Sequence, residues 1–471
     1  MSVPIPIAAE DLPANTVGEE LRALFKLALP IAAAQAGMAL MGLIDTAVVG
    51  RVGAGPLGAV GLGNGIFFGL GVVGLGVMMG LDPLIAQAVG AQNRDRARAL
   101  LYQSGWLALG TTVILAIPIA LAPLLLQPFG VAPEVARDAR NFILWRLPGL
   151  LPMLLFTGTR AYLQGIGRVR ALVISTVIAN VANLGLDVLF VFGKGPIPAM
   201  GASGAGIATS ICSAVQFAVL AWDARANNVE YKGSTPRAAP DVTLLKSALR
   251  VGIPVGLQLG AETGIFALAG LLAGRLGAIE LAAHQVALSL ASFTFCFALG
   301  IGNAAAVRVG WSVGARDHHA VRRRGFCALG AGAAMMSLSG LAFLIIPREV
   351  ASLLSNRPEV LTATVPLLAV AALFQIADGI QAVGAGVLRG LGDTRFAFLA
   401  NLAGHYALGL PIALICGFLL ERGVLGIWWG LSAGLFAVAA ALLARFARVA
   451  GRSFEAIDAA PIETHSTSSS L

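Results

Sequence analysis

The sequence predicts an all-α membrane protein with twelve transmembrane helices in two pseudo-symmetric six-helix lobes. Its 471 residues are 57% hydrophobic and only 12% charged, and the mean hydropathy is +0.84. Soluble domains carry about 25% charged residues, so this composition excludes a soluble fold. Twelve apolar segments are each long enough to cross a hydrocarbon layer of about 30 Å, and the second six repeat landmarks of the first six.

The first half contains six of these segments, each justified by a run of roughly 20 mainly apolar residues. The first of them contains Pro30, where we expect the helix to break, and the fourth is interrupted by Arg146 and Pro148. The six expected spans are 24–49, 57–81, 100–126, 139–160, 170–193 and 203–222.

The second half contains six more spans that satisfy the same length criterion, and its first span carries Pro254 as the counterpart of Pro30. These spans are 246–274, 281–309, 325–346, 361–388, 396–418 and 424–446.

An internal repeat divides the chain into two related halves. An offset of 224 residues matches Pro30 with Pro254 and Gly53 with Gly277. Because six is an even number of spans, both halves enter the membrane from the same side, which predicts a parallel repeat with a cavity between the lobes. The expected organisation is an N-terminal segment 1–23, an N-lobe 24–222, a linker 223–245, a C-lobe 246–446 and a tail 447–471 that we expect to be disordered.

The distribution of positive charge predicts the orientation. The termini and the even-numbered connections carry 21 of the 32 Lys and Arg residues, whereas the odd-numbered connections carry 8. By the positive-inside rule, we expect both termini and the linker to lie in the cytoplasm. The net charge of +8 is spread between spans, so we expect the lipid bilayer, and no nucleic acid, as the macromolecular environment.

Four carboxylates within the spans are the strongest functional signal: Asp45, Asp187, Glu262 and Asp378. A charge at the centre of a membrane helix costs about 2.5–3.5 kcal/mol, and such acids usually face a bundle interior or a wet cavity. We therefore expect them to bind Na⁺ or H⁺. The alternative is that each acid is neutralised by an arginine or a proton and only holds helices together.

Weaker signals accompany the acids. The oxygens of Asn180, Asn183 and Thr209 could complete a cation shell with Asp45 and Asp187, or form interhelical hydrogen bonds. His405 is a possible proton relay within the eleventh span. The four cysteines show no CxxC spacing and there is no phosphate-binding loop, so we expect no enzyme activity, no cofactor and no structural metal.

The acid-bearing stretches resemble the multidrug and toxic compound extrusion (MATE) family, and within it the bacterial NorM-type branch. They are ALMGLIDTAVVGRVG, LGAETGIFALAGLLAGRLGAIELAAHQVAL and ADGIQAVGAGVLRGLGDT, and the resemblance extends from Leu24 to about Arg448. It implies two lobes that alternate between outward and inward states. It also implies an N-lobe cation site with Asp45 and a C-lobe site with Glu262 and Asp378. Asn183 and Asp187 resemble the N-lobe site of the related DinF-like branch.

The resemblance and the acids together predict a monomeric antiporter in a bacterial inner membrane. It is expected to export cationic amphipathic compounds in exchange for Na⁺ or H⁺. A lipid-linked saccharide flippase of the same superfamily is the alternative, and its cavity would carry several arginines for a pyrophosphate. A membrane scaffold or sensor is a third possibility, which would require a folded soluble domain.

Overall fold

The computed structural model describes residues 16–193, 196–229, 239–450 and 457, with the side chains of 227–229 left out. The described chain is all helical and contains twelve helices or helix pairs long and apolar enough to cross a membrane, which confirms the predicted fold class. The twelve spans are Val17–Val49, Ala54–Gly90, Arg94–Leu125, Pro133–Gly165, Arg170–Phe192, Ala202–Ala226, Val242–Leu276, Ala278–Gly314, His318–Ile345, Pro358–Leu391, Thr394–Leu419 and Gly423–Val449.

Several spans consist of more than one helical element. The first half contains α1 (Val17–Val49), α2 (Ala54–Met79), α3 (Leu81–Gly90), α4 (Arg94–Leu121), η2 (Ala122–Leu125), α5 (Pro133–Arg146), η3 (Leu147–Gly149), α6 (Leu150–Gly165), α7 (Arg170–Phe192) and α8 (Ala202–Val229). The second half contains α9 (Val242–Leu276), α10 (Ala278–Gly314), α11 (His318–Ile345), α12 (Pro347–Ser352), α13 (Pro358–Leu391), α14 (Thr394–Leu402), η4 (Ala403–Gly409), α15 (Leu410–Leu414), η5 (Ile415–Leu419) and α16 (Gly423–Val449).

Some helices extend beyond the spans that the sequence predicts. Helix α1 starts at Val17 rather than at residue 24, behind a capping box formed by Thr16 and Glu19. Helix α8 continues to Val229, inside the expected linker. The expected disorder of the tail falls mostly on 451–456 and 458–471, and residues 1–15 also lie outside the described residues.

The expected break at Pro30 is wrong, because α1 continues through it without interruption, and α9 continues likewise through Pro254. A proline within a helix removes one backbone hydrogen bond, and the packing of neighbouring helices in a membrane bundle tolerates that loss. The interruption at Pro148 does occur: a short 3₁₀ turn, η3, separates α5 from α6.

The repeated glycines mark the same turn in each half. Gly53 precedes α2 with φ of 152°, and Gly277 precedes α10 with φ of 149°. This backbone conformation strongly favours glycine, because a Cβ atom would be strained there. The turn therefore explains why the repeat retains a glycine at both positions.

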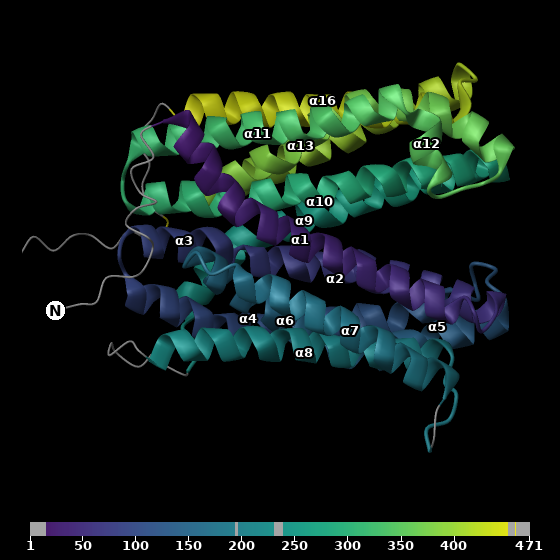
Figure 1. The fold of residues 1–471 in the computed structure, drawn as a ribbon, viewed down its shortest axis with the longest axis horizontal. Helices are drawn as coiled ribbons and strands as arrows, with labels where there is room; N and C mark the ends of the chain where they lie inside the picture. The colour runs from purple at the N-terminus through teal and green to yellow at the C-terminus, as the bar shows by residue number, and fades with distance from the viewer. Residues whose placement is uncertain (1–15, 194–195, 230–238, 451–456, 458–471) are drawn as a thin grey trace, which may run out of the picture.

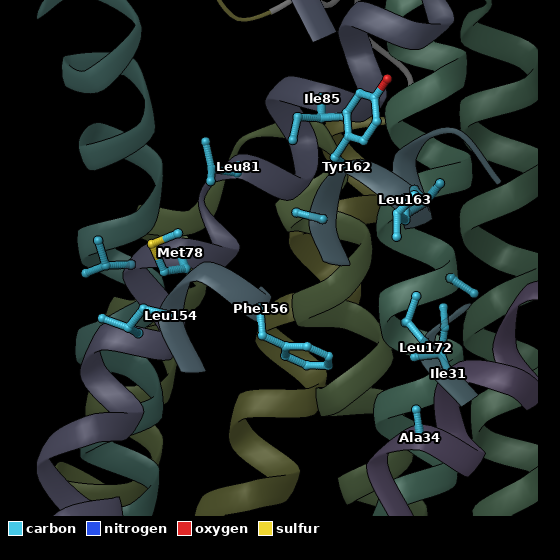
Figure 2. Packing of buried hydrophobic residues seen from close by; sticks show 14 of the residues in the cluster. Ile31, Ala34, Met78, Leu81, Ile85, Leu154, Phe156, Tyr162, Leu163 and Leu172 are labelled. Atoms are coloured by element: carbon cyan, nitrogen blue, oxygen red, sulfur yellow. The ribbon is translucent and has the colours of Figure 1, made fainter. Parts of the chain in front are cut away.

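The two halves lie on opposite sides of the molecule (Figure 1). They meet where α1 packs on α10 and α2 packs on α9. The first half has an apolar core in which Met78 and Leu81 lie near Leu154, while Ile31 and Ala34 lie near Leu172 (Figure 2). Apolar contacts of this kind, together with close approach of small residues, hold helices together inside a bilayer.

The halves contact each other closely at one end of the molecule, which we call the α3 end; α5 and α12 lie at the opposite end (Figure 1). A Cβ atom at Gly80 would meet the backbone of Gly252 at 2.6 Å, so α2 and α9 are in backbone contact there. Gly300 of α10 packs equally closely on Ala28 and Ala32 of α1. Close packing of this kind leaves no space for a ligand path between these helices.

Two hydrogen bonds at the α3 end repeat the internal symmetry. The Gln87 side chain of α3 donates to the Gly390 carbonyl oxygen at 3.0 Å, and the Trp311 indole of α10 donates to the Gly165 carbonyl oxygen at 2.8 Å. Gln87 and Trp311 are equivalent at the offset of 224 residues, and Gly165 and Gly390 are equivalent at an offset of 225. Each half therefore donates one buried hydrogen bond to the other.

Buried ion pairs also join the halves at the α3 end. Glu20 of α1 lies 2.7 Å from the Arg308 guanidinium and 3.6 Å from that of Arg324. Asp82 of α3 lies 3.5 Å from Arg389 of α13. We call these ion pairs, together with the hydrogen bonds of Gln87 and Trp311, the inner closure.

Candidate functional site

The first group of expected site residues gathers around Asp45 on α1, which is buried. The Asn183 amide of α7 donates to Asp45 Oδ1 at 2.9 Å, and the Thr209 hydroxyl of α8 donates to Asp45 Oδ2 at 3.0 Å. Both carboxylate oxygens are thus held by donors from two neighbouring helices. Such donors stabilise the ionised carboxylate in an apolar environment.

Asp187 lies one turn after Asn183 on α7 and is a neighbour of Asp45. It is fully buried, and neither of its carboxylate oxygens has a hydrogen-bond partner among the described residues; the same holds for Asn183 Oδ1. Two adjacent buried carboxylates repel each other unless a proton or cation lies between them. The donor set, made of carboxylate and amide oxygens, suits a hard cation such as Na⁺ as well as a proton.

Asn180 has no hydrogen bond to this group among the described residues, and its side-chain oxygen is buried without a partner there. Its amide donates to the backbone carbonyl oxygens of Gly37 at 3.0 Å and Thr176 at 2.8 Å. Gly37 precedes Asp45 by two turns of α1, so Asn180 joins α7 to α1 at another level. The amide nitrogen thus makes the interhelical hydrogen bond that the sequence left as the alternative, and a part for Asn180 in a cation shell stays a prediction.

The second group gathers around Glu262 on α9. The Asn401 amide of α14 donates to Glu262 Oε1 at 2.8 Å, and the Gln381 amide of α13 donates to the same oxygen. The amide oxygens of Gln381 and Asn401 are buried without partners among the described residues. One carboxylate oxygen is therefore held in place, and Oε2 is left for another ligand.

Glu262 also lines a pocket, which we call the Glu262 pocket, between α9, α10, α13 and α14. Met79 of α2 contributes to its wall from the first half, and Arg389 lines it from the second half. The full lining is Met79, Val255, Gln258, Leu259, Glu262, Phe295, Leu299, Gly302, Asn303, Gln381, Ala382, Ala385, Arg389, Thr394 and Ala397. The wall is mainly apolar with a few convergent polar groups, and the cavity of about 50 Å³ has room for an ion with water but is small for an organic molecule.

Asp378 is buried on α13, one turn before Gln381, and it is an electrostatic neighbour of Glu262, although it does not line the pocket. His405 lies in the π-helical segment η4, one turn after Asn401. Its ring is buried beside Phe266, and neither ring nitrogen has a hydrogen-bond partner among the described residues. No hydrogen bond connects His405 to the acids, so a relay through it stays a prediction.

Sequence patterns did not reveal the side chains that bind Glu262 or the ion pairs that join the two halves. Gln381 follows Asp378 by three positions, so the two share a helix face, and this spacing could have indicated its role. Asp82 lies just beyond the expected span 57–81, and Glu20 lies in the expected N-terminal segment 1–23, so neither counts among the acids within the spans. Their partners Arg389 and Arg308 are distant in sequence, and no local pattern reveals such pairs.

The sequence matches known proteins over most of its length. The MatE family model matches residues 30–189 and 254–415, one segment in each half. The multidrug resistance protein NorM of Burkholderia vietnamiensis is 36% identical over 432 residues, which cover 89% of this chain and 92% of that protein. The multidrug resistance protein MdtK of Yersinia pseudotuberculosis serotype O:1b is 30% identical over 437 residues, covering 90% and 95%.

The fold also has a solved counterpart. The crystal structure of the eukaryotic MATE transporter AtDTX14 superposes with a TM-score of 0.82 at 24% identity, covering 92% of this chain and 98% of that one. This likeness shows that the twelve-helix arrangement is shared. Because the family model and the bacterial relatives both span the two halves, this chain belongs to the MatE family.

Proposed function

We propose that this protein is a secondary active antiporter that exports cationic amphipathic compounds in exchange for Na⁺ or H⁺. The observation that carries the proposal is the presence of two clusters of polar residues inside the spans. One surrounds Asp45 and Asp187, and the other surrounds Glu262. Both groups contain buried oxygens without donors, which suits the binding of a cation. Homologues named for multidrug resistance support the class of substrate.

The orientation follows from the charges. The connections at the α3 end carry most of the Lys and Arg residues, so we assign this end and both termini to the cytoplasm. The inner closure is then a cytoplasmic seal, and the described conformation corresponds to the outward state. A bacterial inner membrane and a monomeric protein are parts of the same proposal.

The transport cycle uses charge to exchange two cations. In the inward state, ionised carboxylates and apolar walls attract a lipophilic cation from the cytoplasm. After the halves rock outward, Na⁺ or H⁺ from outside neutralises the carboxylates, which removes the attraction and releases the compound. One charge that moves down a potential of 100 mV supplies about 2.3 kcal/mol, or roughly fiftyfold accumulation.

The flippase alternative is not favoured. A site for a lipid-linked pyrophosphate needs several cationic side chains. Among the described residues that line the Glu262 pocket, Arg389 is the only cation, and Asp82 and Asn303 already bind it. No structural observation favours a scaffold or sensor over transport.

The test is uptake of a fluorescent organic cation into inverted vesicles, with the Na⁺ gradient and the pH gradient varied independently. We expect uptake that depends on at least one gradient, and its loss in Asp45→Asn and Glu262→Gln, because each change removes a carboxylate that binds the coupling ion.

Both variants must reach the membrane at wild-type amounts for this comparison to count. Wild-type uptake in both would remove these acids from the mechanism. Uptake without any gradient dependence, together with flipping of a lipid-linked saccharide, would overturn the function itself.

A further inference from the structure

We propose that Arg389 couples the inner closure to the cation affinity of the Glu262 pocket. This inference rests on the proposed function, which it deepens by naming the residue through which one event controls the other. Arg389 belongs to both structures, because it lines the pocket and also forms an ion pair across the halves.

The Arg389 guanidinium contacts both halves of the molecule. Its Nη2 donates to Asn303 Oδ1 at 2.6 Å within the second half, and its Nε lies 3.5 Å from Asp82 Oδ2 of the first half. Both members of the ion pair are buried, with side chains 9% and 4% exposed. A buried charge without a counterion is unfavourable, so the pair favours contact between the halves.

Separation of the halves affects the two partners differently. Asp82 has a second electrostatic neighbour, Arg160, in its own half. Arg160 also repels Arg389, but Asp82 acts on Arg389 more strongly, so the loss of Asp82 dominates when the halves separate. Arg389 has no carboxylate partner in the second half among the described residues; its hydrogen bond to Asn303 supplies no charge. Opening of the α3 end therefore leaves the positive charge of Arg389 uncompensated.

That uncompensated charge lies in the wall of the pocket that contains Glu262. When the α3 end is closed, Asp82 offsets the guanidinium, and Glu262 can hold the coupling cation. When the α3 end opens, the free guanidinium repels this cation and can attract the Glu262 carboxylate. Arg389 thus lowers the affinity of the pocket for the coupling cation on the side where that cation must leave.

The experiment measures closure and cation affinity together. Spin labels are placed at Glu134→Cys and Glu359→Cys, exposed positions on α5 and α13 at the end away from α3, in a background in which the four native cysteines are replaced. The distance between the labels reports the fraction of protein with the α3 end closed. This fraction is titrated with Na⁺ at several pH values in lipid nanodiscs.

We compare Asp82→Asn, Arg389→Gln and the double variant. All three lack the ion pair, so we expect each to reduce the closed fraction. The double variant should reduce it no further than the single variants, because both changes remove the same interaction. The midpoint of the cation titration separates them further. It should be about tenfold higher in Asp82→Asn than in the double variant, because only the former leaves a bare guanidinium in the pocket.

A purely structural role for the pair predicts equal midpoints in Asp82→Asn and the double variant, and that result would overturn the inference. The matched control is the Arg445–Asp393 ion pair, at 2.7 Å, which lies within the second half; Asp393→Asn should change neither readout. If Asp82→Asn does not fold, Arg389→Lys and Arg389→Met provide a second test. The lysine variant should keep the closed fraction, and the methionine variant should lose it without a rise in the midpoint of the cation titration, because no guanidinium remains in the pocket. A raised midpoint in Arg389→Met would contradict the inference.

Failure of the proposed function gives a different result. If neither Na⁺ nor H⁺ changes the closed fraction of the wild-type protein, the coupling mechanism itself is wrong. If the wild-type protein responds but the midpoints do not separate, only the role of Arg389 is wrong.

Discussion

At the level of single residues, the two acid groups differ in how their carboxylates are held. Asp45 receives one donor on each oxygen, whereas both donors of Glu262 bind the same oxygen. Both Asp45 oxygens therefore already accept a hydrogen bond, whereas the oxygens of the adjacent Asp187 accept none from the described residues. Glu262 instead offers its own second oxygen to the pocket. The two halves share a repeat, yet the residues that hold the acids differ between them.

Thr209→Val tests the hydroxyl donor at Asp45. A hydrogen bond to a charged group contributes about 1.5–3 kcal/mol, so we expect about a tenfold or larger change in the half-saturating concentration of the coupling ion. With Na⁺ as the coupling ion, this concentration should rise, because a hydroxyl ligand is lost. The measurement is gradient-driven uptake as a function of pH and of Na⁺.

Ser213→Ala is the control for this substitution. Ser213 lies one turn further along α8, and its hydroxyl donates to the Thr209 backbone carbonyl oxygen at 3.0 Å rather than to an acid. An unchanged ion dependence in Thr209→Val would show that Thr209 takes no part in the site.

At the level of secondary structure, the helices that connect the halves use small residues at equivalent positions. A Cβ atom at Gly314 of α10 would lie 2.8 Å from the Ala91 backbone nitrogen, and one at Gly90 of α3 would overlap the Trp311 backbone. The sequence repeat pairs these two glycines, and the structure shows why. The ends of α3 and α10 cross each other near the axis that relates the halves, where no side chain fits.

We expect Gly90→Ala and Gly314→Ala each to prevent full closure of the α3 end. The added methyl group must displace backbone rather than a flexible side chain, which a packed interface resists. Uptake should fall at least about tenfold, and the distance between the outer spin labels should shift away from the closed state. Vesicle uptake and the spin-label distance measure the two effects.

Matched glycines provide the control. Gly105 of α4 and Gly330 of α11 lie in corresponding helices of the two halves, and a Cβ atom at either would meet nothing within 4 Å. Gly105→Ala and Gly330→Ala should retain wild-type uptake. Equal loss in all four variants would indicate a general effect on the helices instead of a specific crossing.

At the level of the whole molecule, the charge distribution and the inner closure lie at the same end. The connections rich in Lys and Arg flank α3, and the buried ion pairs and symmetric hydrogen bonds lie just inside them. Positive charge outside the hydrocarbon layer sets the orientation, while paired charge within it joins the halves.

Single cysteines test this orientation. We expect Gln92→Cys and Arg316→Cys, both exposed at the α3 end, to react with a membrane-impermeant maleimide only in inverted vesicles. Glu134→Cys and Glu359→Cys should react in intact spheroplasts instead. Labelling of Gln92→Cys from outside the cell would reverse the proposed direction of transport.

The sequence by itself determined the membrane fold, the number of spans and the repeat. These depend on local hydrophobicity over about 20 residues and on a fixed offset, both of which can be seen in one chain. It also indicated the four buried acids, because a charge in a hydrocarbon environment is conspicuous. Helix ends were less accurate, since capping at Thr16 extends α1 through residues that are not apolar.

Only the tertiary structure decided which side chains hold those acids and which hold the halves together. Asn183 with Asp45, Gln381 with Glu262 and Asp82 with Arg389 each join helices that are far apart in the sequence. Such contacts depend on how helices cross and on which faces meet, and hydropathy carries no information on either. The physical reason is that hydrophobicity places a helix in the membrane, whereas packing and polar pairing choose its neighbours.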